Sequence, residues 1–190
     1  MINPHFYEFH NMFNDKQIKT INKFIKNNYD REAPTTEGAT DMEGNKLKAV
    51  DTKQIYWIKI KKYLDSAFQF GLQTVNHELG YLIHPFNDYR FINYNIYDSK
   101  QENSYGYHLD DVKGNSPNSY KGTFLINISD SKYKGGEFIY WHNGSEIYIP
   151  HLDTPGSMIY LKPHMYHKVK PVTSGIRKSI SIFLTGPKWR

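Results

Sequence analysis

Residues 177–184 read Arg-Lys-Ser-Ile-Ser-Ile-Phe-Leu, an alternation of two kinds of side chain. Because successive side chains on a strand point to opposite faces, the alternation predicts a β-strand with two different faces. One face carries Arg177, Ser179, Ser181 and Phe183, and the other carries Ile180, Ile182 and Leu184. We expect the isoleucine face to pack on a hydrophobic core and the arginine face to line an interior.

A buried arginine must be paired, so Arg177 predicts an anionic partner. A planar guanidinium prefers a bidentate carboxylate, and Ser179, on the same face, can donate a hydrogen bond to that carboxylate. The alternative is an internal salt bridge to Glu137 or Asp153, although neither spacing demands it.

The chain upstream of this strand shows the same period of two and the same short apolar runs, beginning near residue 81. Turn signals rich in Gly, Pro, Asn and Ser separate the runs. The candidate strands are 88–97, 104–109, 122–129, 136–141, 145–149, 156–161, 166–170 and 177–185. Eight short strands at this spacing predict a sandwich or a jelly roll.

The first 80 residues have helical periodicity instead. Residues 15–29 predict an amphipathic helix with Asn14 as its N-cap and Gln17 as the reciprocal partner of a capping box. Residues 54–77 predict a second helix, whose apolar stripe we assign to the core. That stripe consists of Trp57, Ile60, Leu64, Ala67, Phe68 and Val75. Residues 31–53 predict a long loop, either a cover for a site or a plain connection.

The length of 190 residues fits one domain over residues 1–190, with helical support and a loop in 1–80 and an all-β core in 81–190. A sequence in which the helices precede the strands is typical of folds whose helices pack on the outside of one sheet. The absence of cysteine excludes disulfides, thiolate metal sites and cysteine nucleophiles. With neither a signal peptide nor an apolar run long enough to span a membrane, we expect a cytoplasmic protein. The net charge of +5 comes from lysines spread along the chain, which indicates a solvated surface.

His108-Leu109-Asp110 places two metal-capable side chains at i and i+2. On a strand these two side chains point the same way, whereas Asp111 would point away. The alternative is a surface histidine beside an acidic turn. A later histidine would complete two imidazoles and one carboxylate on one side of an ion, the facial arrangement of non-haem Fe(II) oxygenases.

Two histidines compete for the distal position. His164 follows Pro163 and is expected in a turn, whereas His167 opens an extended run, so we favour His167. His142 and His151 fall in predicted turns, and we expect both to be exposed to solvent.

Three segments carry a resemblance to a known family. Pro163-x-x-x-His167-x-Val169-x-Pro171-Val172-Thr173-Ser174-Gly175-x-Arg177-x-Ser179 is similar to the C-terminal motif of the prolyl-4-hydroxylase-like branch of the 2-oxoglutarate/Fe(II) dioxygenases. Tyr97-(x)8-Gly106-Tyr107-His108-Leu109-Asp110 resembles the first ligand strand of that branch, and Gly135-Gly136-Glu137-Phe138 resembles its internal strand pair. The resemblance covers about residues 88–185.

The resemblance implies a double-stranded β-helix, the jelly roll of this family. It also implies Fe(II), 2-oxoglutarate and O2 as cofactor and co-substrates, with ascorbate as an optional addition. The implied metal ligands are His108, Asp110 and His167. The implied 2-oxoglutarate contacts are Arg177 and Ser179 at the distal carboxylate, with Tyr97, Thr123 and Asn127 as further contacts.

The function implied is hydroxylation of an unactivated C–H, foremost a prolyl residue in a peptide or protein, with release of succinate and CO2. The alternatives are the same chemistry on a free amino acid or other small molecule, and a non-enzymatic metal-binding jelly roll. Asp110 argues against halogenation, because a halide would need its metal position. The nucleic-acid demethylase branch carries a second arginine six residues after the first, where this chain has Phe183, so a nucleic-acid partner is not expected.

Overall fold

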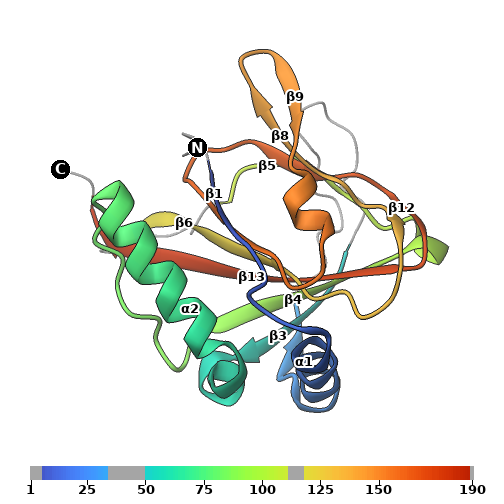
Figure 1. The fold of residues 1–190 in the computed structure, drawn as a ribbon, viewed down its shortest axis with the longest axis horizontal. Helices are drawn as coiled ribbons and strands as arrows, with labels where there is room; N and C mark the ends of the chain where they lie inside the picture. Colours follow the sequence, from blue (N-terminus) through green and yellow to red (C-terminus); the bar gives the residue numbers. More distant parts are fainter. Residues whose placement is uncertain (1–5, 34–49, 111–117, 189–190) are drawn as a thin grey trace.

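The computed structural model describes residues 6–33, 50–110 and 118–188 (Figure 1). Its largest unit is a seven-stranded antiparallel sheet, the major sheet. The strand order is β1 (Phe6–Phe9), β10 (Met158–Leu161), β6 (Asn118–Asn127), β13 (Ile176–Pro187), β4 (Phe91–Asp98), β3 (Asp51–Tyr56) and β2 (Arg31–Glu32). The twelve-residue strand β13 lies at the centre of this sheet.

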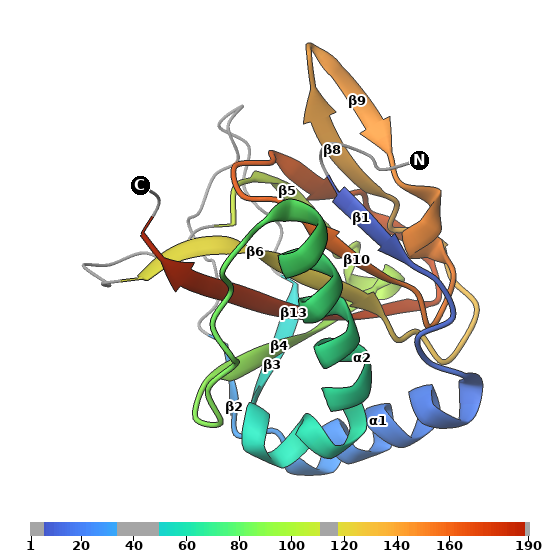
Figure 2. The same cartoon turned by 60° about the vertical axis from the view of Figure 1, so that its left-hand side comes forward.

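A second, four-stranded antiparallel sheet, the minor sheet, lies across from the major sheet (Figure 2). Its order is β5 (Tyr105–His108), β11 (His167–Val169), β8 (Phe138–His142) and β9 (Ser145–Tyr148). A short pair, β7 (Lys134–Gly135) with β12 (Val172–Ser174), and two 3-10 turns, η1 (Ser99–Gln101) and η2 (Pro150–Asp153), connect the strands. The predicted sheet-rich core is therefore confirmed.

Two helices cover the outer face of the major sheet (Figures 1 and 2). Helix α1 (Asp15–Asn28) begins with the predicted capping box, since Asn14 and Gln17 exchange hydrogen bonds of 2.9 and 3.0 Å. Helix α2 (Trp57–Leu79) buries the whole predicted apolar stripe. Ile180, Ile182 and Leu184 are fully buried against these helices, as their side of the alternation predicts.

The prediction of a helix from residue 54 was wrong at its start, because residues 54–56 belong to strand β3. Ile55 pairs with Ile92 and Tyr56 with Phe91 on β4, and the stacked rings of Tyr56 and Phe91 lie 4.1 Å apart. Pairing with β4 outweighs the helical periodicity there. Helix α2 begins only at Trp57 and ends at Leu79, where the capping residue Gly80 adopts a left-handed conformation.

The prediction of a loop over residues 31–53 was likewise wrong at both ends. Residues 31–32 form strand β2 and residues 51–53 belong to strand β3, which pairs with β2. Residues 34–49, the centre of that segment, lie outside the described residues, as does Asp111. Strands β1, β2, β3, β7 and β12 had no counterpart in the prediction. No helix in the described part of the chain is both long and apolar enough to cross a membrane.

Candidate active site

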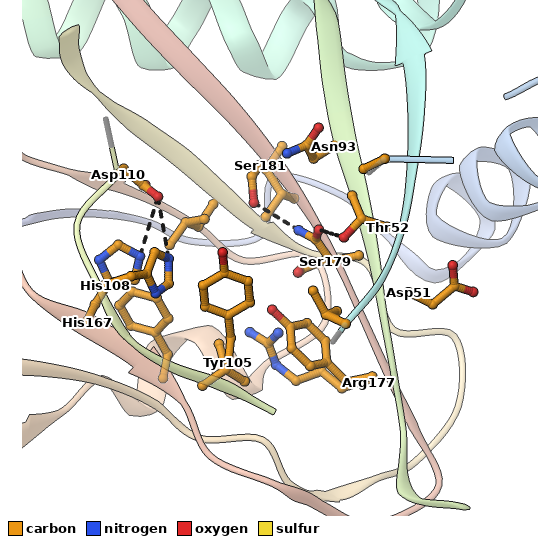
Figure 3. A pocket seen from close by; sticks show the side chains of 18 of the residues that line it. Asp51, Thr52, Asn93, Tyr105, His108, Asp110, His167, Arg177, Ser179 and Ser181 are labelled. Atoms are coloured by element: carbon orange, nitrogen blue, oxygen red, sulfur yellow. Dashed lines mark hydrogen bonds and ion pairs between the residues drawn. The ribbon is translucent and has the colours of Figure 1, made fainter. Parts of the chain in front are cut away.

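The two strands that carry the predicted histidines lie side by side. Strand β5 pairs with β11, and His108 is directly opposite His167. Asp110 follows the end of β5 and turns toward both rings (Figure 3): its Oδ1 is 3.6 Å from His108 Nε2 and 3.7 Å from His167 Nε2. One ligand atom from each of the three side chains lies within 4.8 Å of the others. The structure thus brings together the three residues predicted as metal ligands.

Backbone carbonyls hold both imidazoles in one orientation. His108 Nδ1 is 2.9 Å from the carbonyl oxygen of Gly106, and His167 Nδ1 is 2.8 Å from that of Met165. Each Nδ1–H donates to its carbonyl, which leaves the lone pair on Nε2, the nitrogen that faces Asp110. Such outer contacts fix the tautomer and orientation of metal-binding histidines.

The protonation states also suit a cation. Burial opposes ionisation of Asp110, but the imidazole of His167, then that of His108 and a hydrogen bond from Thr123, lower the pKa of Asp110 to about 2. Burial, reinforced by the nearby His108, lowers the pKa of His167 to about 4. At neutral pH the cluster therefore contains an anionic carboxylate and a neutral buried imidazole, the forms that bind metal.

Arg177 lies on the inner face of β13 with only 2% of its surface exposed. Its Nε and Nη1 have no hydrogen-bond partner among the described residues, and no described carboxylate, Glu137 and Asp153 included, lies within ion-pair distance. The ring of Tyr97 lies 5.3 Å from the guanidinium carbon. A buried guanidinium with two free donors is costly unless an anion joins it.

The metal-ligand cluster and Arg177 line the same cavity, which has a volume of about 360 Å³. Tyr97, Ser179 and Ser181 also line it. Figure 3 shows Tyr105 between the two groups, and its ring lies 4.0 Å from that of His108. The cavity therefore presents metal ligands at one end and a cation at the other.

The sequence prediction missed Tyr105 as a site residue. Period-two alternation puts residues 105 and 108 on opposite faces of a regular strand. The pairing of β5 with β11 is shifted between His108–His167 and Tyr105–Val169, so that β5 contains an extra residue. Such a bulge redirects side chains, which explains why Tyr105 and His108 face the same cavity.

The sequence prediction also missed a polar wall, a row of hydrogen-bonded side chains that lines the cavity opposite the metal-ligand cluster, because strand β3 was not predicted. Thr52 on β3 donates to Asn95 Oδ1 over 2.9 Å, and Asn95 Nδ2 donates to Ser181 Oγ over 3.0 Å (Figure 3). All three residues line the cavity. Their hydrogen bonds extend from β3 across β4 to β13.

Thr123 and Asn127, predicted as co-substrate contacts, do not line this cavity among the described residues. Thr123 Oγ1 donates instead to Asp110 Oδ2 over 2.6 Å. Asn127 Nδ2 donates to Tyr133 Oη and to the carbonyl of Leu152, at 3.0 and 2.7 Å, and its Oδ1 accepts from Ser129 N. These hydrogen bonds place Thr123 behind a metal ligand, and a direct contact of Thr123 or Asn127 with 2-oxoglutarate stays a prediction.

The sequence model of the 2OG-Fe(II) oxygenase superfamily matches residues 91–185. The chain belongs to this superfamily, and its cofactor and co-substrates are accordingly Fe(II), 2-oxoglutarate and O2. No curated protein matches the chain.

Solved structures of prolyl hydroxylases share its fold. A viral collagen prolyl hydroxylase from Paramecium Bursaria Chlorella virus-1, in complex with 2-oxoglutarate, is similar with a TM-score of 0.65, 15% identity and 97% coverage of both chains. A Pseudomonas putida prolyl-4-hydroxylase has a TM-score of 0.68 and 13% identity, covering 97% of this chain and 95% of its own. A Trichoplax adhaerens prolyl hydroxylase, bound to a hypoxia-inducible factor peptide, has a TM-score of 0.64 and 14% identity, covering 95% and 83%.

Proposed function

We propose that this protein is a 2-oxoglutarate- and Fe(II)-dependent dioxygenase that hydroxylates a prolyl residue in a peptide or protein. In this proposal the two facing sheets are the halves of a double-stranded β-helix, and residues 1–190 form one catalytic domain. The observation that carries the proposal is Arg177, a buried cation with two donors that have no partner among the described residues, in the cavity that also holds three metal ligands.

His108, Asp110 and His167 would hold Fe(II). Two neutral imidazoles and one carboxylate suit this ion and leave positions open for co-substrates. Thr123 is a positioning residue in this scheme, because its hydroxyl holds Asp110 Oδ2 and leaves Oδ1 toward the histidines. Tyr120 Oη lies 2.6 Å from Thr123 Oγ1 and completes this support.

Arg177 would bind the distal carboxylate of 2-oxoglutarate through its guanidinium, whose Nε and Nη1 have no partner among the described residues. Ser179, two residues along the same face, would donate its hydroxyl to that carboxylate. Gly136 makes room for the side chain of Arg177: a Cβ there would lie 2.8 Å from Arg177 Cδ, and its φ of +72° already disfavours any other residue. The buried Tyr97 covers the guanidinium and would contact the co-substrate from the side.

When bound, the iron supplies O2 activation coupled to cleavage of 2-oxoglutarate into succinate and CO2, and one oxygen atom enters the substrate C–H. The chain supplies position and shielding. Phe138 stacks on His167 with ring centroids 5.2 Å apart, and Tyr105 covers His108. These rings limit access of water to the two imidazoles.

Two substrate classes remain in the proposal. Fold likeness to three prolyl hydroxylases, one of them bound to a peptide, favours a peptidyl substrate. A carbocyclase from nogalamycin biosynthesis, SnoK, is also similar, with a TM-score of 0.63 and 10% identity over 95% of this chain and 80% of its own, and it supports the small-molecule alternative. The non-enzymatic module has no comparable support. The use of ascorbate stays a prediction.

The test is oxygen incorporation measured by mass spectrometry. Purified protein with Fe(II) and 2-oxoglutarate is incubated with a panel of proline-containing peptides, with free proline as comparator. We expect one added oxygen on a prolyl residue and an equal amount of succinate. Hydroxylation of free proline alone would favour the small-molecule alternative, and absence of succinate in every reaction would refute the enzyme.

A further inference from the structure

A second group of metal-capable side chains lies away from the cavity, where strand β1 ends beside the turn η2 (Figure 2). It consists of Glu8, His10 and His151, and one ligand atom from each lies within 4.8 Å of the others. None of these residues lines the active-site cavity. The group has the same composition as the proposed iron site, two imidazoles and one carboxylate.

The local arrangement also parallels the iron site. Glu8 and His10 stand at i and i+2 at the end of a strand, as His108 and Asp110 do. A distant histidine, His151 in η2, completes the set. The rings of His10 and His151 are 4.2 Å apart, the same separation as the rings of His108 and His167.

His151 is oriented by the backbone. The prediction that it would be exposed was wrong: it is half-buried, and its Nε2 is 3.0 Å from the carbonyl oxygen of Phe9. Nε2 can approach a carbonyl this closely only as the protonated nitrogen, which leaves the lone pair on Nδ1. A backbone carbonyl on one ring nitrogen is the outer contact typical of a metal-binding histidine, and both iron-site histidines show it.

The interactions within the group are weak without an ion. His10 Nε2 lies 3.9 Å from Glu8 Oε2, an exposed pair of the kind that contributes little. A divalent cation would satisfy both imidazoles and the carboxylate at once.

We propose that Glu8, His10 and His151 form a second metal site that binds Zn²⁺. Two nitrogen donors and one carboxylate oxygen, with water as the fourth ligand, give the tetrahedral set that Zn²⁺ prefers. The site joins β1, an edge strand of the major sheet, to η2, so its role is to brace the N-terminal strand. Leu152, next to His151, lines the active-site cavity, so a metal ion bound here would also stabilise part of the cavity wall.

The test is zinc stoichiometry and affinity on the full chain without an affinity tag, measured by equilibrium dialysis and metal analysis. We expect two Zn²⁺ per wild-type chain, one at each cluster. His10→Ala and Glu8→Gln each reduce the number to one at concentrations that saturate the iron site, with affinity at the second cluster lowered about tenfold or more. His108→Ala also reduces the number to one, and His10→Ala combined with His108→Ala leaves none.

His77→Ala is the matched control, because His77 is an exposed histidine 3.1 Å from a carboxylate, Glu78, and belongs to no three-residue group in the described chain. This variant should still bind two ions. Zn²⁺ should also raise the unfolding temperature of His108→Ala but not that of the double variant. A single ion in the wild type that His108→Ala removes, or an unchanged stoichiometry in His10→Ala, would overturn the proposal. His10 and Glu8 are exposed, so both variants should fold.

Discussion

Replacing Arg177 with Met removes the buried guanidinium and leaves a shorter, unbranched apolar side chain. Two donors, Nε and Nη1, are unpartnered in the described structure, and each charge-assisted hydrogen bond to a carboxylate contributes about 1.5–3 kcal/mol. Loss of one partner of a buried ion pair costs about 3–5 kcal/mol. The two estimates overlap and predict that 2-oxoglutarate binds roughly 100- to 4,000-fold more weakly.

Thermal unfolding without O2, with Fe(II) present and with or without 2-oxoglutarate, measures this loss. At a concentration 100 times the wild-type Kd, 2-oxoglutarate should stabilise the wild-type protein by about 2.7 kcal/mol. For a chain of this length that is a rise in Tm of roughly 5–10 °C. The Arg177→Met variant should gain about 1.5 °C or less at the same concentration.

The same experiment without 2-oxoglutarate separates binding from folding. Arg177 is buried and has no ion-pair partner among the described residues, so an apolar replacement should leave the Tm unchanged or raise it. Arg90→Met is the matched control, because Arg90 bonds Thr185 and stacks on Phe86 away from the cavity. A full 2-oxoglutarate response in Arg177→Met, or its loss in Arg90→Met, would refute the assignment.

Three further predictions concern the metal ligands. Asp110→Ala should abolish succinate formation in the presence of Fe(II), and persistent 2-oxoglutarate turnover would show that Asp110 is not a ligand. Thr123→Val should weaken Fe(II) binding about tenfold to 100-fold in a metal titration, while Thr123→Ser retains wild-type affinity, because only the hydroxyl contacts Asp110. The metal-free protein should lose roughly 3 kcal/mol of stability as the pH falls from 6.5 to about 4. In that range the unfolded chain binds a proton at His167 that the folded chain excludes. Denaturant unfolding at several pH values measures this, and His167→Gln should flatten the profile.

Strand β13 shows which features of the fold the local sequence pattern can predict. Its alternation predicted both faces correctly, because a central strand between a helical layer and a cavity repeats its environment every two residues. The capping box at Asn14 was predictable for the same reason, since its partners are three residues apart. The capping box depends on residues that are close in the sequence, and the faces of β13 depend on an environment that is uniform along each face. Both can therefore be predicted from the sequence alone.

Strand β3 shows where the local pattern stops. Residues 51–56 are only partly apolar, and they form a strand because β4 lies beside them. Thr52 faces the cavity for that reason alone, as its bonded neighbour Asn95 comes from β4. Predicting this wall would have required the knowledge that Thr52 pairs with Asn95, 43 residues away in the chain, about which single-sequence periodicity contains no information.

The position of the metal-ligand cluster depends on register in the same way. His108 and His167 face each other because β5 and β11 pair in the register that places these two residues opposite one another. A slip of one residue would turn every side chain of β5 to the other face and carry His108 away from the cavity. The nitrogen–carbonyl bonds at Gly106 and Met165 then hold each ring within the correct register. The motif identifies the ligands, but strand pairing positions them. Insertion of one residue between Tyr107 and His108 should therefore abolish Fe(II) binding with all three ligands still in the sequence, because it moves His108 out of register with His167. If such an insertion bound Fe(II) with wild-type affinity, the register could not be what assembles the site.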